Sequence, residues 1–289
     1  MRKKPTGACG MSAIPVPEHN LGLDETLGEE NMTGRVEGKV CIVTGGAMGL
    51  GEADCRLLAR EGGKVIIVDI ADEAGEALAA NIGAEYYHMD VTAEAPWIEL
   101  IDYVVGKYGK LNVLVNNAGI VIPGNVETCT EEEWRKTKAV SEDATFFGMK
   151  HAIPAMRDSG ELCSIINMSS TAGIVGVPYV FAYAAAKGAV RLMSKAAAVH
   201  CAQNGDNIRV NSIHPGGILT PMTTNIGPVV QAALDADERF KPPITGTTPG
   251  EPQDIGYMVL YLASDESKYT NGAEMVVDNT VTSMEGVVP

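Results

Sequence analysis

Residues 39–69 have the sequence KVCIVTGGAMGLGEADCRLLAREGGKVIIVD, in which two apolar runs flank a glycine-rich turn and an amphipathic segment. The runs Val40–Thr44 and Lys64–Asp69 contain many β-branched residues and predict buried strands. The spacing of apolar residues in Leu50–Arg60 predicts a helix between them. Two buried strands joined by a helix indicate a parallel β–α–β unit.

The same alternation continues along the chain. Further strands are predicted at Glu85–His88, Leu111–Val115, Ser164–Met168, Ile208–Ile213 and Glu274–Asp278. Helices are predicted at Asp72–Asn81, Glu94–Lys107, Glu131–Met156, Tyr179–Ala202 and Gln253–Leu262. Apolar strands alternating with helices predict an α/β fold, a doubly wound parallel sheet of Rossmann type that binds ligands at the carboxyl ends of its strands.

The 289 residues divide into a short arm and one domain. Residues 1–37 have no sustained periodicity and predict a flexible N-terminal arm, either a start-site extension or a segment that orders on a neighbouring subunit. Residues 38–289 form the dinucleotide-binding and catalytic domain. Residues 217–250 lack a clear strand and are long for a connection, so we expect a substrate lid there.

Composition excludes several classes of function. The 22 basic and 37 acidic residues leave a formal net charge of −15, which disfavours nucleic acid and anionic membranes as partners. No apolar run approaches the 18 residues or so of a membrane helix, and the N-terminal sequence does not resemble a secretory signal. The six cysteines form no C-x-x-C pair, and with the scattered histidines they suggest no metal site. We therefore expect a cytoplasmic protein.

The glycine-rich turn, Thr44 to Gly51, is the first candidate site. Glycines permit a tight turn and a close backbone approach to a pyrophosphate, and the following helix directs its N-terminal N–H groups at the anion. A glycine-rich loop alone is weak evidence, but here it follows a strand and precedes a helix, as dinucleotide binding requires.

Asp69, at the end of the second strand, is the second candidate. A carboxylate there can accept hydrogen bonds from both ribose hydroxyls of adenosine and repels a 2′-phosphate. The alternative is that Asp69 caps the next helix. No Arg or Lys flanks Asp69, and Met48 places no positive charge within the glycine turn. Both absences favour NAD over NADP. Asp90-Val91, after the third strand, could contact the adenine.

Together these residues resemble the short-chain dehydrogenase/reductase family over about residues 36–280. The family motif T-G-x-x-x-G-x-G matches Thr44-Gly45 through Gly49 and Gly51, and N-N-A-G matches residues 116–119. The Y-x-x-x-K pair matches Tyr183 and Lys187, with Ser170 thirteen residues before the tyrosine. The P-G motif matches Pro215-Gly216, followed by Thr220. Within the family, several stretches resemble bacterial 3β/17β-hydroxysteroid and cyclic-alcohol dehydrogenases.

The resemblance implies an oxidoreductase that uses Ser170, Tyr183 and Lys187 for catalysis. It also implies a homotetramer in which the two long helices pack across subunits. The cofactor-binding residues that we expect are Gly45, Ala47, Met48, Gly49, Leu50, Gly51, Asp69, Ile70, Asp90, Val91, Asn117, Ala118, Gly119, Tyr183, Lys187, Pro215, Gly216, Ile218 and Thr220.

The residue types suit hydride transfer. A carbinol carbon loses hydride only as its hydroxyl loses a proton, so a base must contact the oxygen. Tyrosine, with an ordinary pKa of about 10, needs a nearby positive charge to act as that base. Lys187 supplies one from the same helix face. Ser170 can hold the substrate oxygen, and its neighbour Ser169 is the competing candidate.

Two positions depart from the family pattern. Ser141 stands where the family usually has an asparagine that holds a water linking the catalytic lysine to solvent. A serine hydroxyl has one donor instead of two, so we expect slower or differently pH-dependent turnover. The second departure is VDNT (Val277–Thr280), where the family often has V-D-G-G, and we expect it to affect only the C-terminal turn.

The sequence therefore predicts an NAD-dependent enzyme that interconverts a secondary, cyclic or steroid-like alcohol and its ketone. The apolar residues of the lid region could close a substrate pocket, or could pack on the sheet or a neighbouring subunit. They are Ile218, Leu219, Met222, Ile226, Val229, Val230 and Leu234. The alternatives are an NADPH-dependent carbonyl or oxoacyl-thioester reductase and a catalytically weak NAD-binding protein.

Overall fold

The computed structural model describes residues 34–236 and 248–283, without the side chains of residues 229–236. Seven parallel strands form one sheet in the order β3-β2-β1-β4-β5-β6-β7. Their bounds are β1 (Val40–Thr44), β2 (Lys64–Asp69), β3 (Glu85–His88), β4 (Val113–Asn116), β5 (Cys163–Met168), β6 (Ile208–Pro215) and β7 (Glu274–Val277). The order reverses between β1 and β4, and this switch point opens a crevice at the carboxyl ends of the strands.

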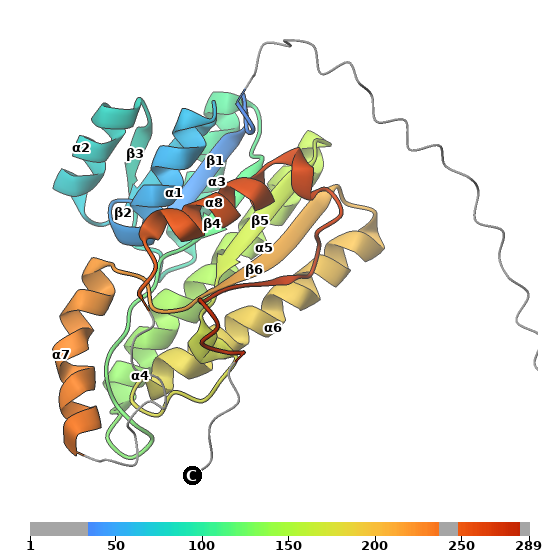
Figure 1. Ribbon diagram of the computed structural model, residues 1–289. Coiled ribbons are helices and arrows are strands. Elements are labelled where there is room, and N and C mark those ends of the chain that lie inside the picture. The colour runs from blue at the N-terminus through green and yellow to red at the C-terminus, as the bar shows by residue number, and fades with distance from the viewer. Residues whose placement is uncertain (1–33, 237–247, 284–289) are drawn as a thin grey trace, which may run out of the picture. The chain divides into compact units, whose positions relative to one another are not determined.

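Helices cover both faces of the sheet, as the alternation of apolar strands and helices predicts (Figure 1). They are α1 (Gly49–Arg60), α2 (Asp72–Ile82), α3 (Ala95–Tyr108), α4 (Glu131–Lys138), α5 (Ala144–Ser159), α6 (Phe181–Asn204), α7 (Pro221–Ala236) and α8 (Pro252–Ala263). The buried side chains of α1, α2 and α8 pack on one face, and those of α3, α5 and α6 pack on the other. Successive strand residues alternate between these two cores, so both faces are apolar.

The predicted helix at 131–156 is a composite. It starts at Thr130, whose side chain accepts from the backbone of Glu133 in a capping box. Between α4 and α5 lies one π-helical turn, η1 (Ala139–Asp143), and the helix continues to Ser159. A π turn inserts an extra residue without breaking the helix, so apolar periodicity does not reveal it.

Two further boundaries differ from the predicted ones. Residues 34–37, which we assigned to the arm, form turns on the domain: Val36 is fully buried and its N–H donates to the Glu61 backbone oxygen at 3.1 Å. The predicted lid region, residues 217–250, where we expected no clear strand, includes the helix α7. Residues 1–33 and 237–247 lie outside the described part.

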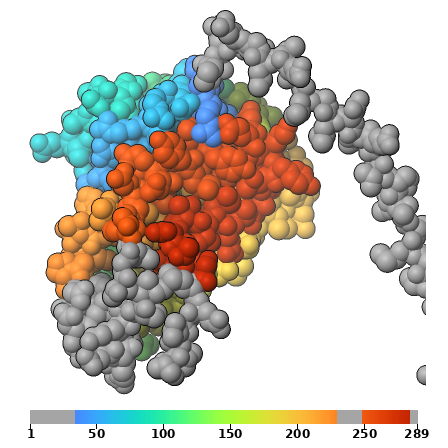
Figure 2. All heavy atoms as spheres, viewed as in Figure 1, coloured from blue at the N-terminus to red at the C-terminus, as the bar shows by residue number. Residues whose placement is uncertain are grey.

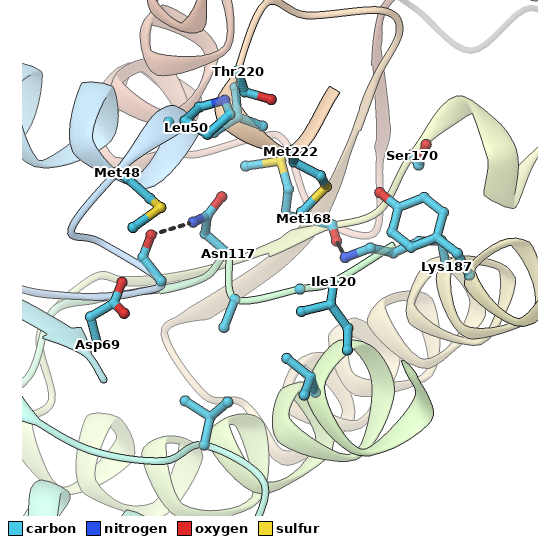
Figure 3. A pocket seen from close by; sticks show the side chains of 18 of the residues that line it. Met48, Leu50, Asp69, Asn117, Ile120, Met168, Ser170, Lys187, Thr220 and Met222 are labelled. Atoms are coloured by element: carbon cyan, nitrogen blue, oxygen red, sulfur yellow. Dashed lines mark hydrogen bonds between the residues drawn. The ribbon is translucent and has the colours of Figure 1, made fainter. Parts of the chain in front are cut away.

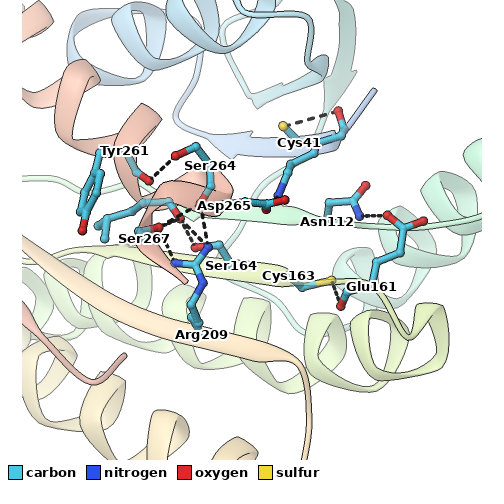
Figure 4. Close-up of polar contacts among 12 residues, drawn as sticks. Cys41, Asn112, Glu161, Cys163, Ser164, Arg209, Tyr261, Ser264, Asp265 and Ser267 are labelled. Atoms are coloured by element: carbon cyan, nitrogen blue, oxygen red, sulfur yellow. Dashed lines mark hydrogen bonds and ion pairs between the residues drawn. The ribbon is translucent and has the colours of Figure 1, made fainter. Parts of the chain in front are cut away.

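Buried Arg209 of β6 holds the end of α8 against the sheet (Figure 4). Its guanidinium donates to the backbone oxygens of Leu262 and Ser264 at 3.0 and 3.2 Å and to the Ser267 hydroxyl at 2.7 Å. A cation suits the negative end of a helix dipole. In the space-filling view the segments after residue 250 form the middle of the face in sight (Figure 2).

Within residues 34–236 and 248–283, no helix has both the length and the apolar composition needed to cross a membrane. The most extensive apolar segments are instead the buried strands, with β1, β5 and β6 buried at every position. The carboxyl edge of this buried sheet carries the candidate site.

Candidate active site

The glycine-rich turn joins the end of β1 to the start of α1. Gly45 has a φ of 61°, a left-handed conformation that residues with a side chain rarely adopt. A Cβ atom on Gly51 would lie only 2.1 Å from the backbone oxygen of Gly45. Asn117, after β4, donates its amide to the backbone oxygens of Thr44 and Gly45, each at 3.0 Å. The turn thus presents bare backbone at a helix N-terminus, a geometry suited to a pyrophosphate.

Asp69 ends β2 beside this turn, and its carboxylate accepts from three backbone N–H groups. Oδ2 accepts from Ala47 at 3.0 Å, and Oδ1 accepts from Ile70 and Ala71 at 2.8 and 3.1 Å. The N-cap residue of α2 is Ala71, so Asp69 is not the helix cap that we considered as an alternative. The negative charge of Asp69 is therefore fixed at the edge of the glycine turn.

A cavity of about 790 Å³ extends along the carboxyl edge of the sheet from Asp69 to Ser170 and Lys187 (Figure 3). Every predicted catalytic or cofactor-binding residue lines it except Ala47, Gly51 and Ser141. Ala47 is buried and contributes its N–H to Asp69, and Gly51 packs directly on the turn.

Other residues line the cavity that the sequence did not single out, among them Thr92, Ile120, Lys136, Val140, Met168 and Met222. Lys136 and Val140 come from α4 and η1, so this helix forms one wall. The sequence does not single out its apolar residues, because a helix face that lines a cofactor site and a helix face buried in the core have the same spacing of apolar residues.

Tyr183 and Lys187 lie one turn apart on α6, facing the end of β5. The Lys187 ammonium lies 5.5 Å from the centre of the Tyr183 ring. Burial raises the pKa of Tyr183 to about 12, and its interaction with the Ser170 hydroxyl opposes this rise. Burial lowers the pKa of Lys187 to about 8, and its ammonium donates to the Met168 backbone oxygen at 2.6 Å. Both groups are thus desolvated, as in a site that binds a ligand over them.

The backbone geometry separates the two candidate serines. Ser169 is buried, and its hydroxyl donates to the Lys187 backbone oxygen at 2.8 Å. Ser170 begins a short 3₁₀ turn, η2 (Thr171–Gly173), and its Oγ accepts from the Ala172 N–H at 3.1 Å. The Ser170 hydroxyl proton therefore stays available for a ligand, whereas that of Ser169 is committed to α6. The spacing argument for Ser170 and this geometry agree.

Ser141 lies in the π-helical turn and is fully buried. Its Oγ accepts from the Ile120 N–H at 3.1 Å and donates to the Ile120 backbone oxygen at 3.3 Å. A Cβ on Gly119 would lie 3.3 Å from Lys187 Nζ and 3.5 Å from Ser141 Oγ, so both atoms border the same point. With its one proton committed to Ile120, Ser141 can offer a water only a lone pair.

The segment after β6 lines the cavity beside the glycine turn, where a Cβ on Gly49 would lie 3.6 Å from the Thr220 Cβ. Thr220 lines it, and the Thr220 hydroxyl accepts from the Thr223 N–H at 3.3 Å at the start of α7. Of the predicted lid residues, Ile218 and Met222 line the cavity, but Leu219 is 57% exposed and does not. The side chains of Val229, Val230 and Leu234 lie outside the described part.

Comparison with known proteins adds to this geometry. A family model described as "Enoyl-(Acyl carrier protein) reductase" matches residues 45–282. The chain is 43% identical over 256 residues to the NADP-dependent (R)-specific alcohol dehydrogenase of Lentilactobacillus kefiri, covering 87% of this chain and 100% of that protein. It is 42% identical over 255 residues to the cyclopentanol dehydrogenase of Comamonas sp. (strain NCIMB 9872), covering 86% and 99%.

A solved structure is also similar. The crystal structure of levodione reductase matches with a TM-score of 0.78 at 30% sequence identity, covering 86% of this chain and 99% of that one. The family model's match, residues 45–282, includes Gly45 to Gly51 of the glycine turn and the Ser170–Tyr183–Lys187 group. The order of motifs along the chain and the arrangement of the site thus point to the same group of proteins.

Proposed function

Because this chain belongs to the short-chain dehydrogenase/reductase family of nicotinamide-dependent oxidoreductases, we propose that it interconverts secondary alcohols and ketones with NAD as cofactor. The observation that carries the proposal is the convergence of Ser170, Tyr183 and Lys187 on the cavity that also contains the glycine turn and Asp69. A nucleotide-binding protein without catalysis would need only the turn and the carboxylate.

The residues present fit a dinucleotide. The cavity of about 790 Å³ is large enough for a ligand of that kind. Gly45 and Gly51 lie in close contact and have no side chains, so no side chain covers the backbone N–H groups there. We expect Asp69 to accept from ribose hydroxyls, and Pro215, Gly216 and Thr220 line the same cavity. The nicotinamide ring, when bound, supplies the hydride acceptor or donor.

The protein's own groups would handle the proton. The Ser170 hydroxyl, whose Oγ already accepts from Ala172, donates to the substrate oxygen and holds it. Tyr183 exchanges a proton with the same oxygen. Its high pKa keeps it protonated in the empty site, ready to donate to a ketone, and positive charge close to the ring favours the phenolate needed for an alcohol. Lys187 supplies part of that charge from 5.5 Å.

Asp69 supports NAD over NADP. Its fixed carboxylate accepts from ribose hydroxyls but repels a 2′-phosphate. The L. kefiri relative is named NADP-dependent, so 43% identity does not by itself decide the cofactor. We base the choice on this one side chain and on the absence of a basic residue beside it in the sequence.

Cyclic alcohols are the proposed substrates. The support is the Comamonas relative named cyclopentanol dehydrogenase and the apolar side chains of Ile120, Met168 and Met222 near the catalytic group. The second candidate is NADPH-dependent reduction of the oxo group of an oxoacyl thioester, and its support is that the family model's description also names an acyl-carrier substrate. The carboxylate at Asp69 disfavours that cofactor.

We also propose a homotetramer assembled through the long helices. Phe146 of α5 and Leu192 and Val199 of α6 are 49%, 68% and 55% exposed in the single chain. Large apolar side chains exposed along two helices are typical of a surface that a second subunit covers. Size-exclusion chromatography with light scattering measures the assembly directly, and a monomeric mass would contradict it.

A substrate panel tests the function. Purified protein is assayed at 340 nm with NAD and NADP against cyclic, steroid and linear secondary alcohols, and in reverse against ketones and an acyl thioester. We expect turnover of cyclic alcohols with NAD. Turnover of the acyl thioester alone, with NADPH, would replace the proposal by the second candidate.

A further inference from the structure

His214 is a buried histidine that connects two loops of the candidate active site. It lies in β6, is fully buried, and directly precedes Pro215-Gly216, which line the cavity. Its Nδ1 lies 3.2 Å from the backbone oxygen of Ser170, and its Nε2 lies 2.8 Å from the hydroxyl of Ser212. One imidazole at the end of β6 therefore contacts the serine after β5.

The two contacts define the protonation of the ring. A carbonyl oxygen can only accept, so Nδ1 must carry a proton, and Nε2 then accepts from the Ser212 hydroxyl. The charged groups nearby are Glu274 of β7 and Arg191 and Lys195 of α6, and Glu274 is paired with both cations at 2.9 and 3.1 Å. Burial lowers the pKa of His214, so the ring is neutral at neutral pH.

Hydrogen bonds hold Ser170 at both its backbone oxygen and its side chain. Its backbone oxygen also accepts from the Gly173 N–H at 2.9 Å, while its Oγ accepts from Ala172 at 3.1 Å. The preceding N–H, that of Ser169, donates to Ile213 at 2.8 Å. Of these bonds, only the one from His214 joins the Ser170 peptide to a side chain of the next strand.

We propose that His214 is a positioning residue for Ser170: its Nδ1–H fixes the serine relative to the Pro215–Gly216 loop, and so relative to the nicotinamide end of the cavity. The inference rests on the proposed function. His214 touches neither substrate nor cofactor, and its effect is to set the distance between the hydroxyl that holds the substrate oxygen and the loop that borders the hydride site. Errors of about 1 Å in such distances can cost ~100-fold in rate.

Three variants separate positioning from packing. His214→Leu removes the donor to Ser170, His214→Asn keeps an N–H donor near the Nδ1 position, and Ser212→Ala removes only the second contact. We expect His214→Leu to lower kcat about 10- to 100-fold with KM for NAD within about twofold, because the adenosine end is untouched. His214→Asn and Ser212→Ala should both retain kcat within about fivefold.

A measurement without turnover accompanies the kinetics. The ¹⁵N shifts of the His214 imidazole in the cofactor-free protein should report the neutral Nδ1–H tautomer. An Nε2–H tautomer would overturn the Ser170 contact, whereas an imidazolium at pH 7 would overturn only the neutral state of the ring. A His214→Leu variant that unfolds at the wild-type temperature and keeps wild-type kcat would overturn its catalytic consequence. If the wild type oxidises no alcohol but shows the Nδ1–H tautomer, the proposed function has failed and the contact has not.

Discussion

Replacing Asp69 with asparagine should relax the preference for NAD over NADP. The variant keeps the shape of the side chain and an oxygen for the N–H groups of Ile70 and Ala71, at 2.8 and 3.1 Å. It removes the negative charge and the acceptor for Ala47, now at 3.0 Å. The hydrogen bond lost there has a charged acceptor and costs about 1.5–3 kcal/mol of folding stability, which thermal unfolding measures.

The size of the effect follows from Coulomb's law. A 2′-phosphate carries a charge of about −1.5 to −2. At about 5 Å from the carboxylate, each unit of that charge costs about 1 kcal/mol in water and about 3 kcal/mol near a protein surface. Asp69 is half-buried, so we expect kcat/KM for NADP to rise by ~100-fold in the variant, or about 3 kcal/mol. Activity with NAD should fall about tenfold as charged hydrogen bonds to the ribose become neutral.

The assay compares kcat/KM for both cofactors in the wild type, Asp69→Asn and a matched control. Asp90→Asn is that control, because Asp90 also lines the cavity and, among the residues that the structure describes, its carboxylate accepts from the nearby Thr92 N–H alone, at 2.9 Å. The gain with NADP should shrink as salt is added. The reasoning is refuted if NADP kinetics do not change, or if both variants gain equally.

Further substitutions test Ser141, Lys187 and the C-terminal turn at Asn279 and Thr280. Ser141→Asn supplies a second donor beside Lys187 and should raise kcat severalfold or shift its pH profile; no change in either would show that this position does not limit proton exchange. Lys187 has a pKa of about 8 when folded and 10.5 as its ordinary value, so the unfolded chain binds more protons between these pH values and stability rises through that window. Lys187→Met should therefore stabilise the cofactor-free protein by about 2 kcal/mol at pH 7, less toward pH 10.5, and abolish turnover; equal gains by urea unfolding at both pH values would contradict this. Thr280 has a φ of 75°, so Thr280→Gly should increase the folding stability of the protein by about 1 kcal/mol. Asn279 has a φ of 46°, and its replacement by glycine should increase stability by less. A lower melting temperature for Thr280→Gly would refute the assigned strain.

Local pattern was sufficient for most of the fold. The strands β1, β2 and β3 begin and end at the predicted residues, because β1 and β2 are rich in β-branched residues and adjoin glycines, and β3 contains two tyrosines, which also favour strands. The helix α7 could not be predicted, since Gly227 and Pro228 interrupt its pattern and both disfavour a helix interior. The π turn at 139–143 could not be predicted either, because it depends on contacts of Ser141 with Ile120, which no periodicity encodes.

For the candidate site too, the sequence predicts some residues and contains no sign of others. Motif spacing predicted Ser170, Tyr183 and Lys187, and the structure brings the serine after β5 and the two α6 residues to one cavity. The sequence predicts no role for His214, because the scattered histidines form no metal-site spacing. Its contact with Ser170 spans 44 residues and arises only when β5 and β6 pair, so a single sequence contains no sign of it.

VDNT (Val277–Thr280) is a departure whose consequence the structure makes specific. Asp278 packs against Gly216, where a Cβ would lie 2.8 Å from the Asp278 Cα. The two residues after it adopt positive φ without being glycine. The strained turn is thus attached to the loop that lines the cavity. The sequence comparison with V-D-G-G had suggested only a local effect.

The most direct test of the account compares wild type and Tyr183→Phe with cyclopentanol and NAD at 340 nm. The variant lacks only the phenolic oxygen, so folding and cofactor binding should persist and can be checked by thermal unfolding with and without NAD. We expect NAD reduction by the wild type and a loss of about 1000-fold or more in kcat for the variant. Wild-type turnover in Tyr183→Phe would contradict the assignment of this tyrosine as the acid and base of the reaction.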